Sequence, residues 1–129
     1  MDDENSDSSP SASPLNAAVG AVRFVTEDLF FLQVVPDSGV RDFIPGQSLA
    51  LGLPANAPRA PHLPPEPEAE NNTVNNTAKI IKRAYSIGSS PDEKRFYEFY
   101  IALVHQGALT PRFLCLEAGS RLFAATKPV

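Results

Sequence analysis

Short apolar runs broken by turn-forming residues constrain the fold of this chain more than any other feature. Two runs rich in Val, Phe and Leu, residues 19–25 and 29–35, flank Thr26-Glu27-Asp28, which is typical of a strand, a tight turn and a second strand. Residues 48–53 alternate apolar with small side chains, as a strand with one buried face does. The run at 96–105 could pass for a buried helix, but its density of Phe, Tyr, Ile and Val favours a strand. With two further runs, the sequence predicts six strands, at residues 19–25, 29–35, 48–53, 79–87, 96–105 and 122–126.

Two segments of different composition set the domain organisation. Residues 1–17 are acidic and rich in Ser, Pro and Ala, and they hold too little apolar surface to offset the entropy of ordering them. We therefore predict a disordered tail at 1–17 and one domain at 18–129, which is an ordinary domain length. Residues 54–77 are first proline-rich and then asparagine-rich, and they predict a loop insertion of unknown role within that domain.

Charge and composition argue against several classes of function. The net charge of −4 provides no basic field for nucleic acid, and no basic cluster or long apolar run points to a membrane. The acidic N-terminus is unlike a secretion signal, so we expect a cytoplasmic protein. The two histidines, His62 and His105, have no Cys or His at metal-ligand spacing, so no metal site is expected. Cys115, the only cysteine, stands among apolar residues and is expected to be buried rather than nucleophilic.

The stretch Lys82-Arg83-Ala84-Tyr85-Ser86 carries the candidate binding chemistry. Side chains alternate along a strand, so Arg83 and Tyr85 share one face, while Ala84 and Ser86 share the other. A guanidinium fork beside a flat ring suits a ligand with a phosphate at one end and a planar ring system at the other. The alternative is an ordinary amphipathic strand whose Arg83 and Tyr85 cover the outside of a barrel.

A second candidate element begins near residue 110. Thr110 suits the N-cap of a helix and Pro111 suits its first position, so the sequence predicts a short helix running to about Leu116. The N–H groups at a helix start can bind an anion, and Gly107 would let the backbone approach a phosphate closely. The alternative is a capped surface helix that touches no ligand.

Three motifs, in order along the chain, resemble those of the ferredoxin–NADP reductase superfamily in its bacterial form. Arg83-Ala84-Tyr85-Ser86 resembles the R-x-Y-S flavin signature of that family. Downstream, Glu98-Phe99-Tyr100 and residues 107–112 resemble the second signature, and upstream Pro45-Gly46-Gln47 resembles the turn before a barrel strand. The resemblance covers about residues 20–126 and concerns only the first of the family's two domains.

The resemblance implies a fold and a cofactor. The fold is all-β, a six-stranded antiparallel Greek-key β-barrel with one short capping helix, and the cofactor is FAD. Arg83 would hold the pyrophosphate, Tyr85 would stack on the isoalloxazine ring, and Ser86 would hydrogen-bond near the reactive ring nitrogen. The flavin carries the redox chemistry, so no residue is assigned a catalytic role. The other implied cofactor-binding residues are Ala84, Tyr100, Gly107, Ala108, Leu109 and Thr110.

By the same resemblance, the activity is electron transfer between NADPH and ferredoxin or flavodoxin. These residues contain no G-x-G-x-x-G phosphate loop, so we expect NADP(H) to be reached only through a domain that the chain lacks. Two alternatives stay open. The chain could be a cofactor-free β-barrel interaction module, since fold does not fix function, or one half of a split reductase.

Overall fold

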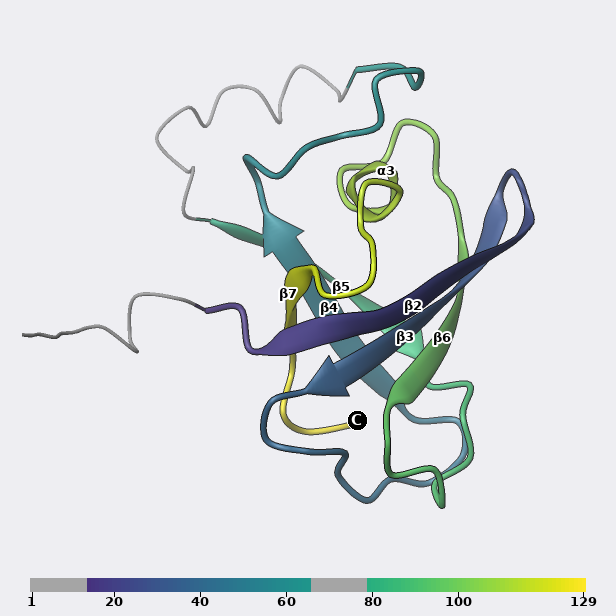
Figure 1. The fold of residues 1–129 in the computed structure, drawn as a ribbon, viewed down its shortest axis with the longest axis vertical. Helices are drawn as coiled ribbons and strands as arrows, with labels where there is room; N and C mark the ends of the chain where they lie inside the picture. The colour runs from purple at the N-terminus through teal and green to yellow at the C-terminus, as the bar shows by residue number, and fades with distance from the viewer. Residues whose placement is uncertain (1–13, 66–78) are drawn as a thin grey trace, which may run out of the picture.

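The structure, a computed structural model, describes residues 14–65 and 79–129 (Figure 1). The predicted disordered tail and the second half of the predicted loop insertion lie mostly outside these residues. The described part is nearly all-β, with six strands and one short helix, as the sequence predicted. The elements are β2 (Ala17–Thr26), β3 (Leu29–Pro36), β4 (Ser48–Pro54), β5 (Ile80–Ser86), β6 (Tyr97–Ala102), α3 (Thr110–Phe113) and β7 (Arg121–Ala124).

The six strands form one antiparallel sheet in the order β5-β4-β7-β2-β3-β6. The last strand, β7, lies between β4 and β2, which joins strands distant in sequence into a Greek-key arrangement. The edge strands β5 and β6 meet at an isolated bridge between Ile87 and Phe99, beside which the Gly88 N–H donates to the Glu98 carbonyl at 2.7 Å. The six predicted antiparallel strands are thus confirmed, but the sheet is not closed by a continuous ladder, so the predicted barrel is only approximate.

Alternation of apolar side chains places the core on the inner face of the curved sheet. On β4, Leu49 and Leu51 are fully buried, and Leu53 is nearly so. The other strands supply further core residues, which pack with Phe113 of α3 at one end of the sheet. The largest of them are Phe30, Leu32, Val34, Tyr97, Phe99, Ile101 and Leu122.

Short polar contacts hold the segments around the sheet. The Asn16 side chain bonds both the N–H and the carbonyl of Ala124, at 2.8 and 2.9 Å, so Asn16, within the predicted tail, is held against β7. In the turn before β4, Gly46 has a φ of +97°, a conformation that glycine adopts without strain. The Gln47 side chain closes that turn by accepting a bond from the Ile44 N–H at 2.8 Å. In the described part of the chain, no helix is long and apolar enough to span a membrane.

Candidate functional site

The candidate site is the unpaired stretch between the facing edges of β5 and β6 beyond their single bridge, which we call the gap. The Glu98 carbonyl accepts from Gly88 and the Glu98 N–H donates to the Ser89 hydroxyl at 2.9 Å, so the Glu98 backbone faces β5. Alternate residues of an antiparallel strand direct their backbone groups to the same side, so the Tyr100 and Ala102 backbones also face β5. In Figure 1 the two strands come together low in the view and diverge upward, toward the end that carries α3.

The same reasoning orients β5. The Ile87 N–H donates to the Gln47 carbonyl at 2.9 Å, so odd-numbered residues of β5 direct their backbone toward β4 and even-numbered ones toward the gap. Continuing the register of the Ile87–Phe99 bridge would place Ala84 opposite Ala102. No strand pairing joins these two residues in the described ladders. Two strand edges that no ladder joins therefore face each other across the gap.

Arg83 lies on the core side of β5 at this gap. It is directly opposite Leu51, and cross-strand partners in an antiparallel pair project to the same face of the sheet. Its side chain is nevertheless exposed, because β5 is an edge strand, and its guanidinium donates to the Lys82 carbonyl at 2.8 Å. Within the described residues, no carboxylate pairs with it. This placement argues against the alternative in which Arg83 covers the outside of a barrel.

Tyr85 shares that face and is packed from one side. It lies opposite Leu49, and its ring centroid is 5.9 Å from that of Phe113 in α3, with the ring planes tilted by 55°. Burial raises the pKa of Tyr85 to about 12, an effect that the nearby charge of Arg83 partly opposes. Ala84 and Ser86 are exposed on the other face. Tyr85 is therefore a half-buried ring that packs against α3.

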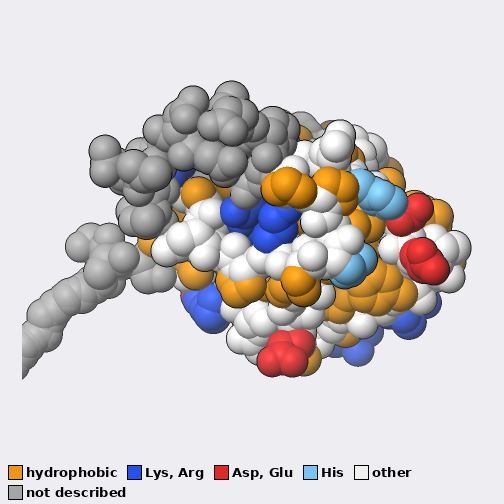
Figure 2. Space-filling view, turned by 90° about the horizontal axis from the view of Figure 1, so that it is seen from above, with side chains coloured by type: hydrophobic (Ala, Val, Ile, Leu, Met, Phe, Trp, Pro, Cys, Tyr) orange, Lys and Arg blue, Asp and Glu red, His pale blue; other side chains and the backbone are white. Residues whose placement is uncertain are grey.

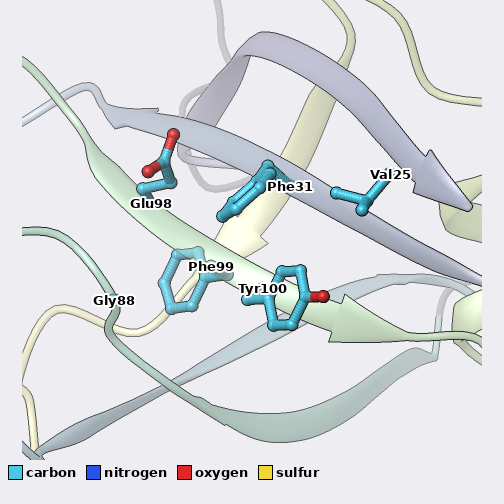
Figure 3. Close-up of a pocket in the computed structure, with 6 residues that line it drawn as sticks. All are labelled: Val25, Phe31, Gly88, Glu98, Phe99 and Tyr100. Atoms are coloured by element: carbon cyan, nitrogen blue, oxygen red, sulfur yellow. The ribbon is translucent and has the colours of Figure 1, made fainter.

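Tyr100 lies on the outer face of β6, at the narrow end of the gap. Its side chain is 52% exposed, and its ring contacts Phe31 of β3 at a centroid distance of 4.8 Å. It lines a pocket of about 380 Å³ that does not include Arg83 or Tyr85 (Figure 3). The structure thus brings Tyr100 to the gap from a different face than Tyr85. The pocket-lining residues are Val25, Phe31, Gly88, Glu98, Phe99 and Tyr100.

The predicted cap of α3 is wrong. The N-cap is Leu109, which makes no side-chain capping bond, and Thr110 is the first helical residue. The Thr110 hydroxyl instead accepts from the Val104 N–H at 2.8 Å and donates to the Val104 carbonyl at 3.2 Å. Because that hydroxyl is engaged by the chain leaving β6, and Thr110 is buried, it does not face solvent. The helix also ends at Phe113, three residues before the predicted end at Leu116.

The other predicted residues near α3 lie in the connection between β6 and α3. Ala108 and Leu109 are buried. A Cβ added at Gly107 would lie 3.1 Å from the Val104 side chain, so a larger residue at position 107 would crowd Val104. Cys115 was predicted to be buried and is exposed, since α3 ends before it. No group of three metal-ligating side chains occurs within residues 14–65 and 79–129.

Two arginines that connect α3 with the segments around it were not predicted from the sequence. Arg112 of α3 is buried and donates to the carbonyls of Ala55, Ala57 and Ala108 at 2.6–3.1 Å. Arg59 donates to the carbonyls of His105 and Gly107. Arg112 belongs to the second motif quoted above, which could have drawn attention to it. Arg59 stands alone in a proline-rich segment and gives no periodic signal.

Comparison with known proteins supplies similar folds but no close sequence relative. No protein-family model matches the chain, and no curated protein matches it. Among solved structures, a ferredoxin NADP⁺ reductase from Neisseria gonorrhoeae with bound FAD and NADP is similar, with a TM-score of 0.63 and 18% identity over 88% of this chain. A ferredoxin reductase of carbazole 1,9a-dioxygenase has a TM-score of 0.60 and 28% identity over 89% of this chain.

A third similar structure is the flavohem-like FAD/NAD binding domain of a nitric oxide dioxygenase from Vibrio cholerae O1, with a TM-score of 0.60, 17% identity and coverage of 89% of this chain. The chain spans 37%, 28% and 43% of the lengths of these three proteins, respectively. The similarity therefore concerns one domain of each, and it confirms the fold that the motifs implied.

Proposed function

We propose that this chain, which has the fold of the FAD-binding domains of the ferredoxin–NADP reductase superfamily, binds FAD and forms the flavin-carrying part of an oxidoreductase. The observation that carries the proposal is the position of Arg83. Arg83 presents an exposed guanidinium on the core side of an edge strand, and among the described residues no carboxylate is bonded to it. An anionic ligand at the gap between β5 and β6 would explain it.

The residues present fit FAD. The guanidinium of Arg83 can bind two phosphate oxygens at once, and the Tyr85 ring, backed by Phe113, offers a flat surface for stacking. The backbone groups of Ala84 and Ala102 that face the gap can hydrogen-bond the polar edge of a flavin or its ribityl chain. Ser86, exposed beside them, can add a hydroxyl. When bound, FAD would supply hydride and electron transfer, while the protein binds and orients it.

Two further contacts are part of the proposal. Tyr100 would contact the ligand from the narrow end of the gap, where it lines the pocket shared with Phe31. Gly107, Ala108, Leu109 and Thr110 would lie along the phosphates through their backbone. The Thr110 hydroxyl would act indirectly, because its bonds to Val104 fix where this backbone runs.

The redox partners are proposed from the similar structures. One of them is a ferredoxin NADP⁺ reductase with FAD and NADP bound, and another is a ferredoxin reductase. We infer that the physiological partner of this chain is a ferredoxin or flavodoxin, and that NADPH reduces the flavin through a nucleotide-binding domain outside these 129 residues. A cytoplasmic location is consistent with that role.

A flavin titration of the purified protein tests the proposal. We expect FAD to bind more tightly than FMN, and FMN more tightly than riboflavin, because each added phosphate can meet Arg83 or the 107–110 backbone. Quenching of flavin fluorescence gives the three dissociation constants. Equal affinity for FAD and riboflavin would show that the protein has no site for the phosphates. No binding of any flavin would favour a cofactor-free interaction module.

A further inference from the structure

The described half of the predicted loop insertion is fastened across α3. We call residues 55–65 the strap. The Ala60 N–H donates to the Pro111 carbonyl at 3.2 Å, and Ala60 itself is buried. From the other side, Arg112 of α3 donates to the strap carbonyls of Ala55 and Ala57 at 2.6 and 3.1 Å. The strap is therefore part of the packed structure at the end of the sheet that carries the candidate phosphate-facing backbone.

Arg59 makes the reciprocal contact, from the strap to the connection between β6 and α3. Its guanidinium donates to the Gly107 carbonyl at 2.6 Å and to the His105 carbonyl at 3.2 Å. It also holds the strap in shape through two bonds to the Pro64 carbonyl, at 2.6 and 3.3 Å. Every acceptor recorded for this guanidinium within the described residues is a neutral backbone carbonyl. One side chain thus ties together two segments that lie more than 40 residues apart in sequence.

These contacts matter for an anion beside the connection. Carbonyl oxygens repel phosphate oxygens, so a phosphate can lie along residues 105–108 only if the carbonyls of His105 and Gly107 are directed elsewhere. Arg59 directs both carbonyls toward itself and adds a positive charge that no carboxylate among the described residues neutralises. Figure 2 looks onto this end of the molecule, where Lys or Arg side chains lie near the middle of the face and acidic side chains lie toward its edge.

We propose that Arg59 is a positioning residue for the phosphate-facing connection at 105–108, so that the strap makes this chain selective for a dinucleotide flavin over flavins with fewer phosphates. The inference rests on the proposed FAD function. Arg59 acts through the backbone of His105 and Gly107 and need not touch the ligand itself. Its removal leaves two carbonyls without their donor and takes away a positive charge at the phosphate end, while the ring end, around Tyr85, stays unchanged.

Three variants test the inference: Arg59→Ala, Arg59→Lys and the control Arg41→Ala. Arg41 is exposed, and removing its side chain changes the net charge equally. We expect Arg59→Ala to weaken FAD binding by about tenfold or more, since two charge-assisted bonds and the carbonyl orientation are lost. Riboflavin affinity should stay as in the parent protein. Arg59→Lys, which keeps the charge but cannot span the carbonyls, should lie between. If Arg59→Ala weakens FAD and riboflavin binding equally, or if Arg41→Ala weakens FAD binding as much as Arg59→Ala does, the proposed role of Arg59 in flavin selectivity is overturned.

Amide hydrogen exchange of the flavin-free proteins gives a readout that does not depend on flavin. If Arg59 fastens the connection, residues 105–109 should exchange faster in Arg59→Ala than in the parent, while β2 and β3 stay equally protected. Unchanged exchange at 105–109 would overturn the fastening role. If the parent protein binds no flavin, the proposed function and the selectivity both fail, whereas the fastening role still stands or falls on the exchange result. A loss of protection throughout the sheet would show that Arg59 is needed for folding rather than for positioning.

Discussion

Replacing Arg83 by alanine should weaken FAD binding without affecting the fold. The side chain is exposed, and its recorded bond goes to the carbonyl of the residue before it. The free energy of unfolding should therefore change by no more than about 0.5 kcal/mol. If the guanidinium binds two phosphate oxygens, its loss should cost about 1.5–3 kcal/mol of binding, or a factor of about 10–150 in the dissociation constant. Arg83→Lys keeps the charge without the fork and should recover only part of this.

Lys82→Ala is the matched control for Arg83→Ala. Lys82 is the adjacent residue and carries the same charge, but its side chain is on the opposite face, with its ammonium 4.5 Å from the centre of the Phe123 ring. FAD titrations of the parent and the three variants at low and high salt separate a specific contact from a general field, because salt screens the field more strongly. If Lys82→Ala weakens binding as much as Arg83→Ala does, or if Arg83→Ala unfolds the protein, Arg83 does not hold the phosphates.

Three further changes test the site, the sheet and the redox role. Burial raises the pKa of Tyr85 from 10.0 to about 12, so the protonated phenol favours the folded state. That contribution to stability is present below about pH 10 and is lost between about pH 10 and 12. In urea unfolding, Tyr85→Phe should therefore remove the loss of stability between these pH values. A Cβ at Gly52 would lie 2.6 Å from the Ile81 carbonyl oxygen of β5, so Gly52→Ala should lower the free energy of unfolding by about 1–3 kcal/mol, whereas Gly20→Ala, with its nearest neighbour at 3.4 Å, should be milder. Bound FAD in the 129-residue protein should be bleached anaerobically by dithionite but only slowly by NADPH, since no site in these residues is expected to position a nicotinamide; rapid, saturable bleaching by NADPH would place a second nucleotide site within this chain.

The strands were predictable because their signal is local. Alternation at 48–53 and the turn at 26–28 survive in β4 and in the β2–β3 hairpin, since each depends on neighbours in sequence and on one buried face. The face shared by Arg83 and Tyr85 follows from the same period of two. Which side of the sheet that face lies on required the register with Leu51 and Leu49.

The rest depends on contacts that no local pattern carries. Thr110 has the residue type and position of an N-cap, but its hydroxyl finds the backbone of Val104, six residues away, so the cap prediction failed. The sequence predicted a strand up to residue 105, but β6 ends at Ala102, where its pairing with β3 ends. Arg59 could not be predicted to fasten the connection, because its acceptors at 105 and 107 are brought near only by the completed fold. Tyr85, Arg83 and Ser86 stay predicted ligand contacts.

The most direct test of the flavin site is the backbone amide spectrum of ¹⁵N-labelled protein during titration with FAD. We predict the largest shifts at the amides that face the gap, those of Ala84 and Ser86 on β5 and of Ala102 on β6, together with the 107–110 backbone. Amides of β2 near Ala17 should keep their shifts, because β4 and β7 separate β2 from β5, and β3 separates it from β6. Shifts confined to other strands, or an unchanged spectrum at saturating FAD, would contradict a flavin site between β5 and β6.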